Sequence, residues 1–419
     1  MRTLGRVIAL GAAVVVCAGL AACSSASGAG TVPGSSSDVS FVVDGTTTYG
    51  TLEVPAHRSG QRLAAALLIP GSGPTNRDGN DPGLGVTPDT LLLVAGILAR
   101  QGIMTFRYDK YFTGQTGSGA FASDPDAATV TSFARQAEAA YAFLKSQPDA
   151  DPGQILIVGH SEGGMYALVV ADSVTGKPAG LALLEPQDER ILGLVERQTD
   201  EKIDSLVAEG QLSGAEGRGN ADAVRRAISQ FRAGQTVSTE GMSPMVVQLL
   251  APEIMAPSVA NYLRSDEAIV PASYAARMAS GTRVLVTDGT RDPNVPPSTI
   301  GPLADALATP GTTGPGLRIL QGTDHYMHLD SQPDNEPVLA PAAVAAIAEW
   351  AEPFASAPES PTGTWTGENV PGRISRPRPS GPGRALRGSL TPNKSPSCGD
   401  STETRTPHRD FRALAINPV

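Results

Sequence analysis

Residues 155–166 read ILIVGHSEGGMY, and this stretch decides how the chain folds. Four β-prone residues run into a Gly-x-Ser-x-Gly turn centred on Ser161, and a helix-like segment follows. The pattern also arises by chance in a chain with 46 glycines, so its meaning depends on the surrounding elements. A serine at a strained strand-to-helix turn needs small neighbours, which Gly159, Gly163 and Gly164 provide. The stretch predicts that Ser161 is a nucleophile.

Around this turn, strand-like and helix-like segments alternate through residues 39–356. This alternation predicts an α/β fold with a mostly parallel sheet and helices on both faces. The first two strands, 39–44 and 47–55, are expected to form a hairpin at Asp44-Gly45. The further strands are expected at 62–70, 103–109, 154–158, 180–186, 283–289 and 316–322, and the helices at 88–101, 130–147, 162–173 and 340–352.

Residues 187–276 interrupt the alternation with charged, amphipathic helical sequence. The insertion falls between two predicted sheet strands. We therefore expect a helical cap at the edge of the sheet where the site would lie, acting as a lid. A peripheral helical layer that never covers the site is the alternative.

Both ends of the chain differ from this central unit. Arg2 and Arg6 precede an apolar run that ends in Leu-Ala-Ala-Cys at Cys23, which resembles a bacterial lipobox. Residues 1–22 are therefore predicted to be a signal peptide, with lipidation at Cys23 and a flexible linker over 24–38. Secretion without a lipid anchor is the alternative.

The last segment, residues 357–419, is rich in Pro, Ser and Arg, with nine basic and five acidic residues. It lacks apolar periodicity, so we expect a disordered basic tail. The whole chain of 419 residues has a net charge of −10, which argues against nucleic-acid binding. Its three cysteines leave no pair for a disulfide within the central unit, and no Cys/His cluster has zinc spacing.

Polar residues follow several of the predicted strands. Ser161 comes first, then Asp288 and Asp292, and then His325 and His328. Loops at the carboxyl ends of parallel strands meet at one edge of a sheet, so these residues are expected to converge. A serine, an acid and a histidine are the residue types of nucleophilic acyl transfer.

This arrangement resembles the α/β-hydrolase family over nearly all of residues 39–356. The resemblance rests on four motifs in the family's order: PGSGP (70–74), GHSEGG (159–164), DGTRDPNVP (288–296) and QGTDHYMH (321–328). It implies an α/β-hydrolase fold.

The resemblance also implies the roles of particular residues. Ser161, Asp292 and His325 would form the catalytic triad. The backbone N–H groups of Glu162 and Ser72 would form the oxyanion hole. Pro70 stands where many family members carry histidine, so Gly73 remains a rival to Ser72.

The expected function is a serine hydrolase that cleaves small-molecule or lipid esters or thioesters, with no cofactor and no metal. Its lipidated Cys23 would anchor it to the outer face of the cell membrane or cell envelope. Two alternatives remain: a serine aminopeptidase-like enzyme, and a non-catalytic envelope-binding lipoprotein on a hydrolase scaffold.

Overall fold

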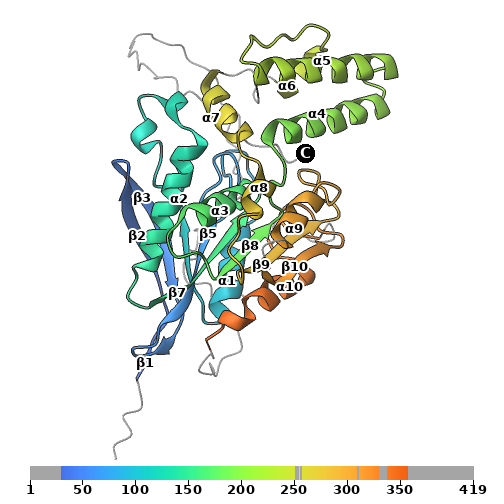
Figure 1. Ribbon diagram of the computed structural model, residues 1–419. Helices are drawn as coiled ribbons and strands as arrows, with labels where there is room; N and C mark the ends of the chain where they lie inside the picture. Colours follow the sequence, from blue (N-terminus) through green and yellow to red (C-terminus); the bar gives the residue numbers. More distant parts are fainter. Residues whose placement is uncertain (1–29, 251–253, 255–256, 309–310, 330–336, 357–419) are drawn as a thin grey trace, which may run out of the picture.

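The computed structural model describes residues 30–250, 254, 257–308, 311–329 and 337–356. The predicted signal peptide 1–22, the lipidation site Cys23 and the tail 357–419 lie outside these residues. At the centre is an eight-stranded sheet with the strand order β10-β9-β8-β7-β5-β6-β3-β2 (Figure 1). Its strands are β2 (Ser35–Val43), β3 (Thr46–Val54), β5 (Leu63–Ile69), β6 (Met104–Tyr108), β7 (Ala150–His160), β8 (Gly180–Leu184), β9 (Arg283–Gly289) and β10 (Thr313–Leu320).

The sheet is mostly parallel, as the alternation of segments predicts. Strands β6, β5, β7, β8, β9 and β10 pair in parallel, whereas β3 is antiparallel to both of its neighbours. The β2–β3 hairpin turns at Asp44 and Gly45, which both have positive φ angles, of 49° and 75°. Two consecutive positive φ angles are typical of a type I′ turn, whose twist matches that of the strands.

Helices cover both faces of the sheet because successive side chains of a buried strand point to opposite faces. On β5, Leu63, Ala65, Leu67 and Ile69 belong to one core cluster, while Ala64, Ala66 and Leu68 belong to another. The first cluster includes residues of α2 (Val130–Lys145), α3 (Glu162–Ser173), α8 (Pro271–Ala275) and α9 (Gly301–Ala308). The second includes residues of α1 (Thr90–Arg100) and α10 (Pro341–Ala351).

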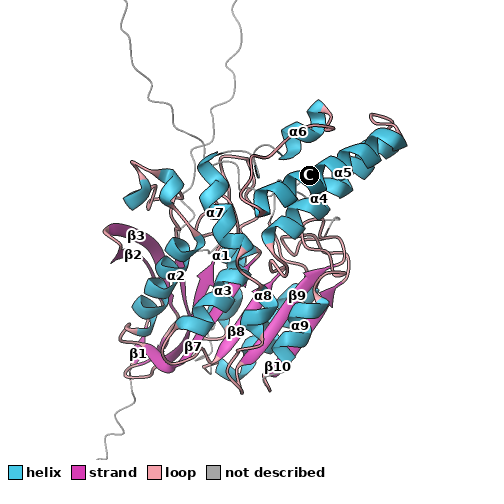
Figure 2. Ribbon diagram, turned by 45° about the horizontal axis from the view of Figure 1, so that its top comes forward, coloured by secondary structure: helices cyan, strands magenta, loops and turns pink. Residues whose placement is uncertain are grey.

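A group of helices between β8 and β9 forms the cap, at one end of the sheet (Figure 2). Its members are α4 (Ile191–Ala208), α5 (Gly214–Arg232), α6 (Pro244–Leu250) and α7 (Pro257–Glu267). Their apolar faces form a third core that also contains Val295 from the loop after β9. The predicted cap range 187–276 includes α8, and Ala275 of α8 packs in the first core. Helix α7 contributes to both cores, through Leu263 to the third and through Val259 and Tyr262 to the first.

Three local features differ from the sequence prediction. Strand β2 begins at Ser35, and a two-residue strand, Thr31–Val32, pairs with His57–Arg58, so the linker predicted for 24–38 is wrong over these residues. Residues 35–38 are polar, but their backbone pairs with β3. Helix α9 was not expected, although a parallel β9–β10 pair needs a crossover between its strands. Among the described residues, no helix is both long enough and apolar enough to cross a membrane.

Candidate active site

Ser161 lies at a sharp turn between β7 and α3. Its φ and ψ angles are 56° and −127°, which are sterically costly for a residue with a side chain. The turn is held because the Ser161 N–H donates to the Leu184 carbonyl at 2.9 Å, and the Ser161 carbonyl accepts from Gly164 and Gln187. A Cβ atom added to Gly159 would lie 2.1 Å from the Gly163 carbonyl oxygen. Glycine is therefore required at this position.

His325 and Asp292 form a buried pair beside the serine. His325 Nδ1 lies 2.7 Å from Asp292 Oδ2, and the Asp292 side chain is fully buried. Asp292 Oδ1 accepts the backbone N–H groups of Asn294 at 2.7 Å and Val295 at 3.0 Å. Burial alone would raise the pKa of Asp292. The charge and hydrogen bond of His325, together with the two N–H donors, have the larger effect, so the pKa of Asp292 lies below its usual value. The geometry fits an ionised Asp292.

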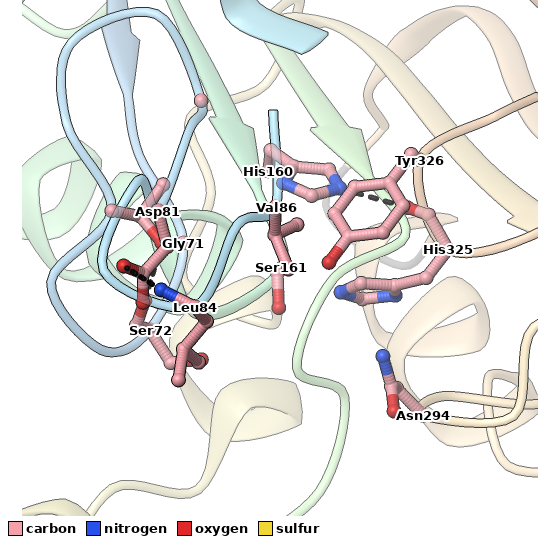
Figure 3. A pocket seen from close by; sticks show the side chains of 12 residues that line it. Gly71, Ser72, Asp81, Leu84, Val86, His160, Ser161, Asn294, His325 and Tyr326 are labelled. Carbon is pink, nitrogen blue, oxygen red and sulfur yellow. Dashed lines mark hydrogen bonds between the residues drawn. The ribbon is translucent and has the colours of Figure 1, made fainter. Parts of the chain in front are cut away.

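Ser161 and His325 line one cavity, and Asp292 is joined to it through its hydrogen bond to His325. Figure 3 shows a ring nitrogen of His325 directed toward the Ser161 hydroxyl. The remaining wall comes largely from the segment 71–86, which follows β5 and includes Ser72, Asp81 and Leu84. None of the described residues of α4–α7 lines this cavity. The segment between β5 and α1 borders the serine instead.

The cap acts on this site through the loop that carries the acid. Arg197 Nη2 and Gln198 Nε2 of α4 both donate to the Asn294 carbonyl, at 2.7 and 3.2 Å. Val295 enters the cap core. The same loop donates two N–H groups to Asp292, so the cap helps to hold the acid in place.

His160, which the sequence treats only as the variable residue of the turn, has a positioning contact. Its Nε2 lies 2.8 Å from the backbone carbonyl of His325, and burial, followed by the charge of His325, lowers the pKa of His160 to about 3. A carbonyl only accepts, so a neutral His160 donates from Nε2. The serine turn is thereby tied to the histidine loop.

Lys110 ties together the two segments that are predicted to supply the oxyanion donors. Its Nζ donates to the Gly71 carbonyl and lies 3.6 Å from Glu162 Oε2. A Cβ atom on Gly71 would lie 3.1 Å from Ser161 Cβ, so this loop packs directly against Ser161. Ser72 lines the serine cavity, whereas Gly73, with φ 62°, lines a neighbouring one. This placement favours Ser72 over Gly73 as the nearer donor.

Asp109 and His328 have structural contacts. Asp109 accepts hydrogen bonds from the backbone N–H and the guanidinium of Arg77. His328 closes a turn with Asp324, and it does not belong to the described lining of the serine cavity. Burial lowers the pKa of His328.

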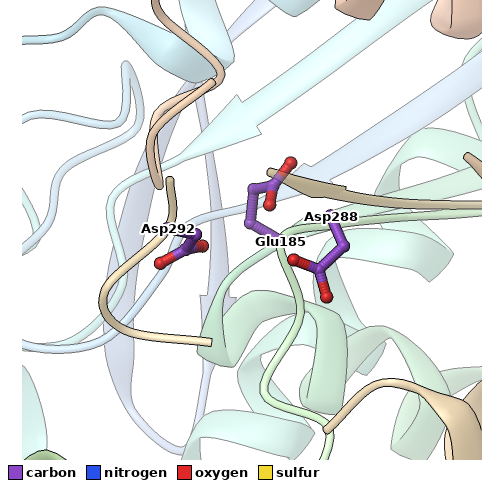
Figure 4. Close-up of side chains that lie close together, drawn as sticks. All are labelled: Glu185, Asp288 and Asp292. Atoms are coloured by element: carbon purple, nitrogen blue, oxygen red, sulfur yellow. The ribbon is translucent and has the colours of Figure 1, made fainter. Parts of the chain in front are cut away.

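Three buried carboxyl groups lie close together (Figure 4), and one of them, Asp292, bonds His325. Glu185, Asp288 and Asp292 each offer an oxygen within 4.8 Å of the others. This spacing could hold a cation, but both oxygens of Asp292 already accept hydrogen bonds. Burial, and then the charge of Asp292, raises the pKa of Asp288 to about 8 and that of Glu185 well above its usual range. The cluster therefore fits one ionised acid beside two protonated ones.

Asp288→Asn is expected to stabilise the protein increasingly as the pH rises from about 4 to about 8. In this range the unfolded state releases the Asp288 proton while the folded state keeps it, so the wild type loses stability and the variant does not. The difference grows by at most about 1.4 kcal/mol per pH unit. Thermal melting of both proteins across this range is the measurement. A melting difference that does not change with pH would contradict the protonated state of Asp288.

The parallel sheet, the strained serine turn and the buried His–Asp pair define the class of hydrolases built on an α/β sheet. A family model described as "Alpha/beta hydrolase family" matches residues 66–338. The chain therefore belongs to the alpha/beta hydrolase family, and the fold expected from the resemblance is confirmed.

Solved structures with a similar fold include esterases and a peptidase. Est1E from Butyrivibrio proteoclasticus with bound ferulic acid is 16% identical, with 75% of this chain and 97% of that chain covered and a TM-score of 0.46. Carboxyl esterase 2 from Tuber melanosporum is 15% identical, with 77% and 87% covered and a TM-score of 0.44. Proline iminopeptidase from Mycobacterium smegmatis is 16% identical, with 76% and 98% covered and a TM-score of 0.44. No curated protein matches the chain.

Proposed function

We propose that the protein is a serine hydrolase that cleaves carboxylic esters or thioesters through an acyl-enzyme on Ser161. The observation that carries the proposal is the strained Ser161 facing His325, whose other ring nitrogen bonds the buried Asp292 at 2.7 Å. A nucleophile, a base and an orienting acid in this order are the parts of acyl transfer.

In the first half-reaction, His325 Nε2 takes the Ser161 proton as Oγ attacks the ester carbonyl carbon. The N–H groups of Glu162 and Ser72 stabilise the negative oxygen of the tetrahedral intermediate, each contributing roughly 3 kcal/mol. His325 then protonates the leaving oxygen or sulfur as its bond to carbon breaks. Asp292 holds the imidazole tautomer and stabilises the imidazolium without accepting the proton.

In the second half-reaction, His325 takes a proton from water, and the resulting nucleophile attacks the acyl-enzyme. The bond to Ser161 Oγ breaks, Oγ regains a proton from His325, and the carboxylic acid leaves. No step in this sequence uses a cofactor or a metal.

A fluorophosphonate probe tests the nucleophile. The wild type is expected to become labelled, and Ser161→Ala is expected to remain unlabelled because the attacking oxygen is gone. Thr75→Ala is a suitable control, since the Thr75 hydroxyl lies in the same cavity but donates to the Ser72 carbonyl at 2.7 Å. An unlabelled wild type would favour the non-catalytic envelope-binding lipoprotein.

Ester and amide substrates separate the two enzyme candidates. Turnover of p-nitrophenyl esters is expected to exceed turnover of aminoacyl-p-nitroanilides. The cavity beside Glu162 also contains the Lys110 ammonium, which pairs with Glu162 and leaves that acid less available to a substrate amino group. Amide turnover above ester turnover would replace the esterase with an aminopeptidase-like enzyme.

The proposal includes export and a lipid anchor at Cys23, supported by the sequence Leu-Ala-Ala-Cys after an apolar run. Cys23→Ala is expected to move the protein from the membrane fraction to the soluble fraction, because the anchoring acyl chains need that thiol. Fractionation of expressing cells, followed by immunoblotting, is the measurement. Cys17→Ala is the matched control, and an equal loss from membranes in both variants would contradict lipidation at Cys23.

A further inference from the structure

Lys110, which follows β6, is a buried lysine that takes no part in the two half-reactions. The residue is 5% exposed, and its Nζ donates to the Gly71 carbonyl. Nζ also lies 3.6 Å from Glu162 Oε2 and 5.9 Å from the centre of the Phe133 ring. Burial of an ammonium is costly unless its partners compensate, so these contacts fix the position of Nζ.

The Gly71 carbonyl belongs to the same peptide group as the Ser72 N–H. This peptide is trans, so its C=O and N–H bonds point in opposite directions. Ser72 lines the cavity that contains Ser161, whereas Lys110 does not belong to the described lining of that cavity. Because the carbonyl is held toward Lys110, the N–H of the same peptide is held away from Lys110, on the side of the serine cavity.

The Ser72 N–H is available to a bound oxygen. Ser72 is half-buried, and no described residue accepts a hydrogen bond from its N–H. Nothing in residue 71 itself fixes the direction of this peptide, since glycine has no Cβ to exclude the turned-over orientation. In that orientation the Gly71 carbonyl would face the serine cavity, and its partial negative charge would repel the oxygen of the tetrahedral intermediate. The bond from Lys110 holds the carbonyl away from this position.

Glu162, whose N–H is the other expected oxyanion donor, is held by the same ammonium. Its Oε2 faces Lys110, and its Oε1 accepts from the Tyr262 hydroxyl at 2.6 Å. The Tyr262 oxygen also lies 2.5 Å from the Tyr166 oxygen, so the carboxylate is part of a buried chain of hydrogen bonds. Lys110 is therefore in contact with both segments that carry the donors, one through a backbone carbonyl and one through a carboxylate.

We propose that Lys110 is a positioning residue that sets the direction of the Gly71–Ser72 peptide and thereby keeps the oxyanion hole formed. This inference rests on the proposed function, because it requires a tetrahedral intermediate on Ser161. Lys110 contacts neither the substrate nor the reacting atoms. It acts through the Gly71 carbonyl, so its effect is on stabilisation of the transition state and not on binding of the substrate in its ground state.

Lys110→Met tests the inference, because methionine fills a similar length but donates no hydrogen bond to Gly71. For p-nitrophenyl acetate, kcat is expected to fall by about 10²-fold, the usual effect of losing one oxyanion donor, while KM stays within a few-fold. Phenylboronic acid provides a second measurement. It forms a tetrahedral adduct with a serine oxygen and places a negative oxygen where the oxyanion forms, so its inhibition constant is expected to rise by about the same factor as kcat falls.

Two further variants separate positioning from a general effect on the fold. Lys177→Met is the matched control, since Lys177 Nζ also donates to backbone carbonyls, those of Ala171 at 3.1 Å and Asp172, but beyond the other end of α3. Its kcat and its inhibition by phenylboronic acid are expected to stay within about twofold of the wild type. The double variant Lys110→Met/Glu162→Gln removes the carboxylate charge that Lys110→Met leaves without its cation. It is expected to recover the melting temperature lost in Lys110→Met but not the kcat.

If Lys110→Met does not fold, the double variant supplies the kinetic measurements. Recovery of kcat together with the melting temperature in the double variant would overturn the inference, because Lys110 would then only balance the charge of Glu162. Unchanged kcat or unchanged phenylboronic acid inhibition in Lys110→Met would overturn it as well. In each of these cases the wild type remains an active serine hydrolase. Absence of both ester turnover and fluorophosphonate labelling in the wild type would instead overturn the proposed function, and the inference with it.

Discussion

His325→Ala is expected to lower kcat for p-nitrophenyl acetate by about 10⁶-fold, and Ser161→Ala by a similar factor. Ser161 attacks the substrate only when His325 takes its proton. His325 in turn has no hydroxyl to activate when Ser161 is absent. The double variant is therefore expected to be no slower than either single variant. About 10³-fold catalysis over water should remain, from the oxyanion donors and substrate binding.

His328→Ala is the matched control for His325→Ala. His328 belongs to the same loop, but it closes a turn with Asp324 and lies outside the described lining of the serine cavity. Its replacement is expected to change kcat only a few-fold. Melting curves of all variants would show that each is folded. A large loss in His328→Ala, or a double variant far slower than the single ones, would contradict the assignment of the base.

The sheet could be predicted from the sequence because its strands are buried on both faces. Segments such as 63–69 and 155–158 are continuous apolar runs, which mark strands of a covered parallel sheet. The first residues of β2 could not be predicted in this way. Ser35, Ser36 and Ser37 are exposed and have no apolar pattern, and they join the sheet through backbone pairing with β3. Backbone pairing of this kind needs no apolar side-chain pattern, so the sequence does not reveal it.

The convergence of Ser161, Asp292 and His325 could be predicted from chain order, because the carboxyl ends of parallel strands share one edge. The contacts that position them could not. His160 bonds the carbonyl of His325 across 165 residues, and Lys110 bonds the carbonyl of Gly71 across 39. These contacts depend on the direction of a buried side chain and on loop geometry, which spacing along the chain does not encode.

For the cap, too, the helices could be predicted from the sequence but their position relative to the site could not. Its helices could be predicted from amphipathic periodicity, since each buries one face in a shared core. Its position relative to Ser161 depends on packing between elements. Arg197 and Val295 place the cap on the acid loop, and Tyr262 places it beside Glu162. The cap therefore contributes to holding Asp292 in place.

Asp292→Asn is expected to lower kcat by about 10⁴-fold with little change in KM. An amide at this position offers an N–H to His325 Nδ1, which favours the tautomer that cannot accept the Ser161 proton at Nε2. It also removes the negative charge that stabilises the imidazolium. Both effects arise in the chemical step, so kcat falls while ground-state binding is kept. Steady-state kinetics at pH 7 is the measurement.

Asp288→Asn tests whether the acid that orients His325 is Asp292 or the neighbouring Asp288. Burial and the charge of Asp292 raise the pKa of Asp288 to about 8, so Asp288 is largely protonated at pH 7 and asparagine preserves its charge. Its kcat is expected to stay within a few-fold of the wild type at that pH. If Asp288→Asn lost about 10⁴-fold and Asp292→Asn did not, the acid that orients His325 would be Asp288. A neutral side chain in position 288 is tolerated by the mechanism, because the cluster needs only one negative charge, and His325 bonds the residue that carries it.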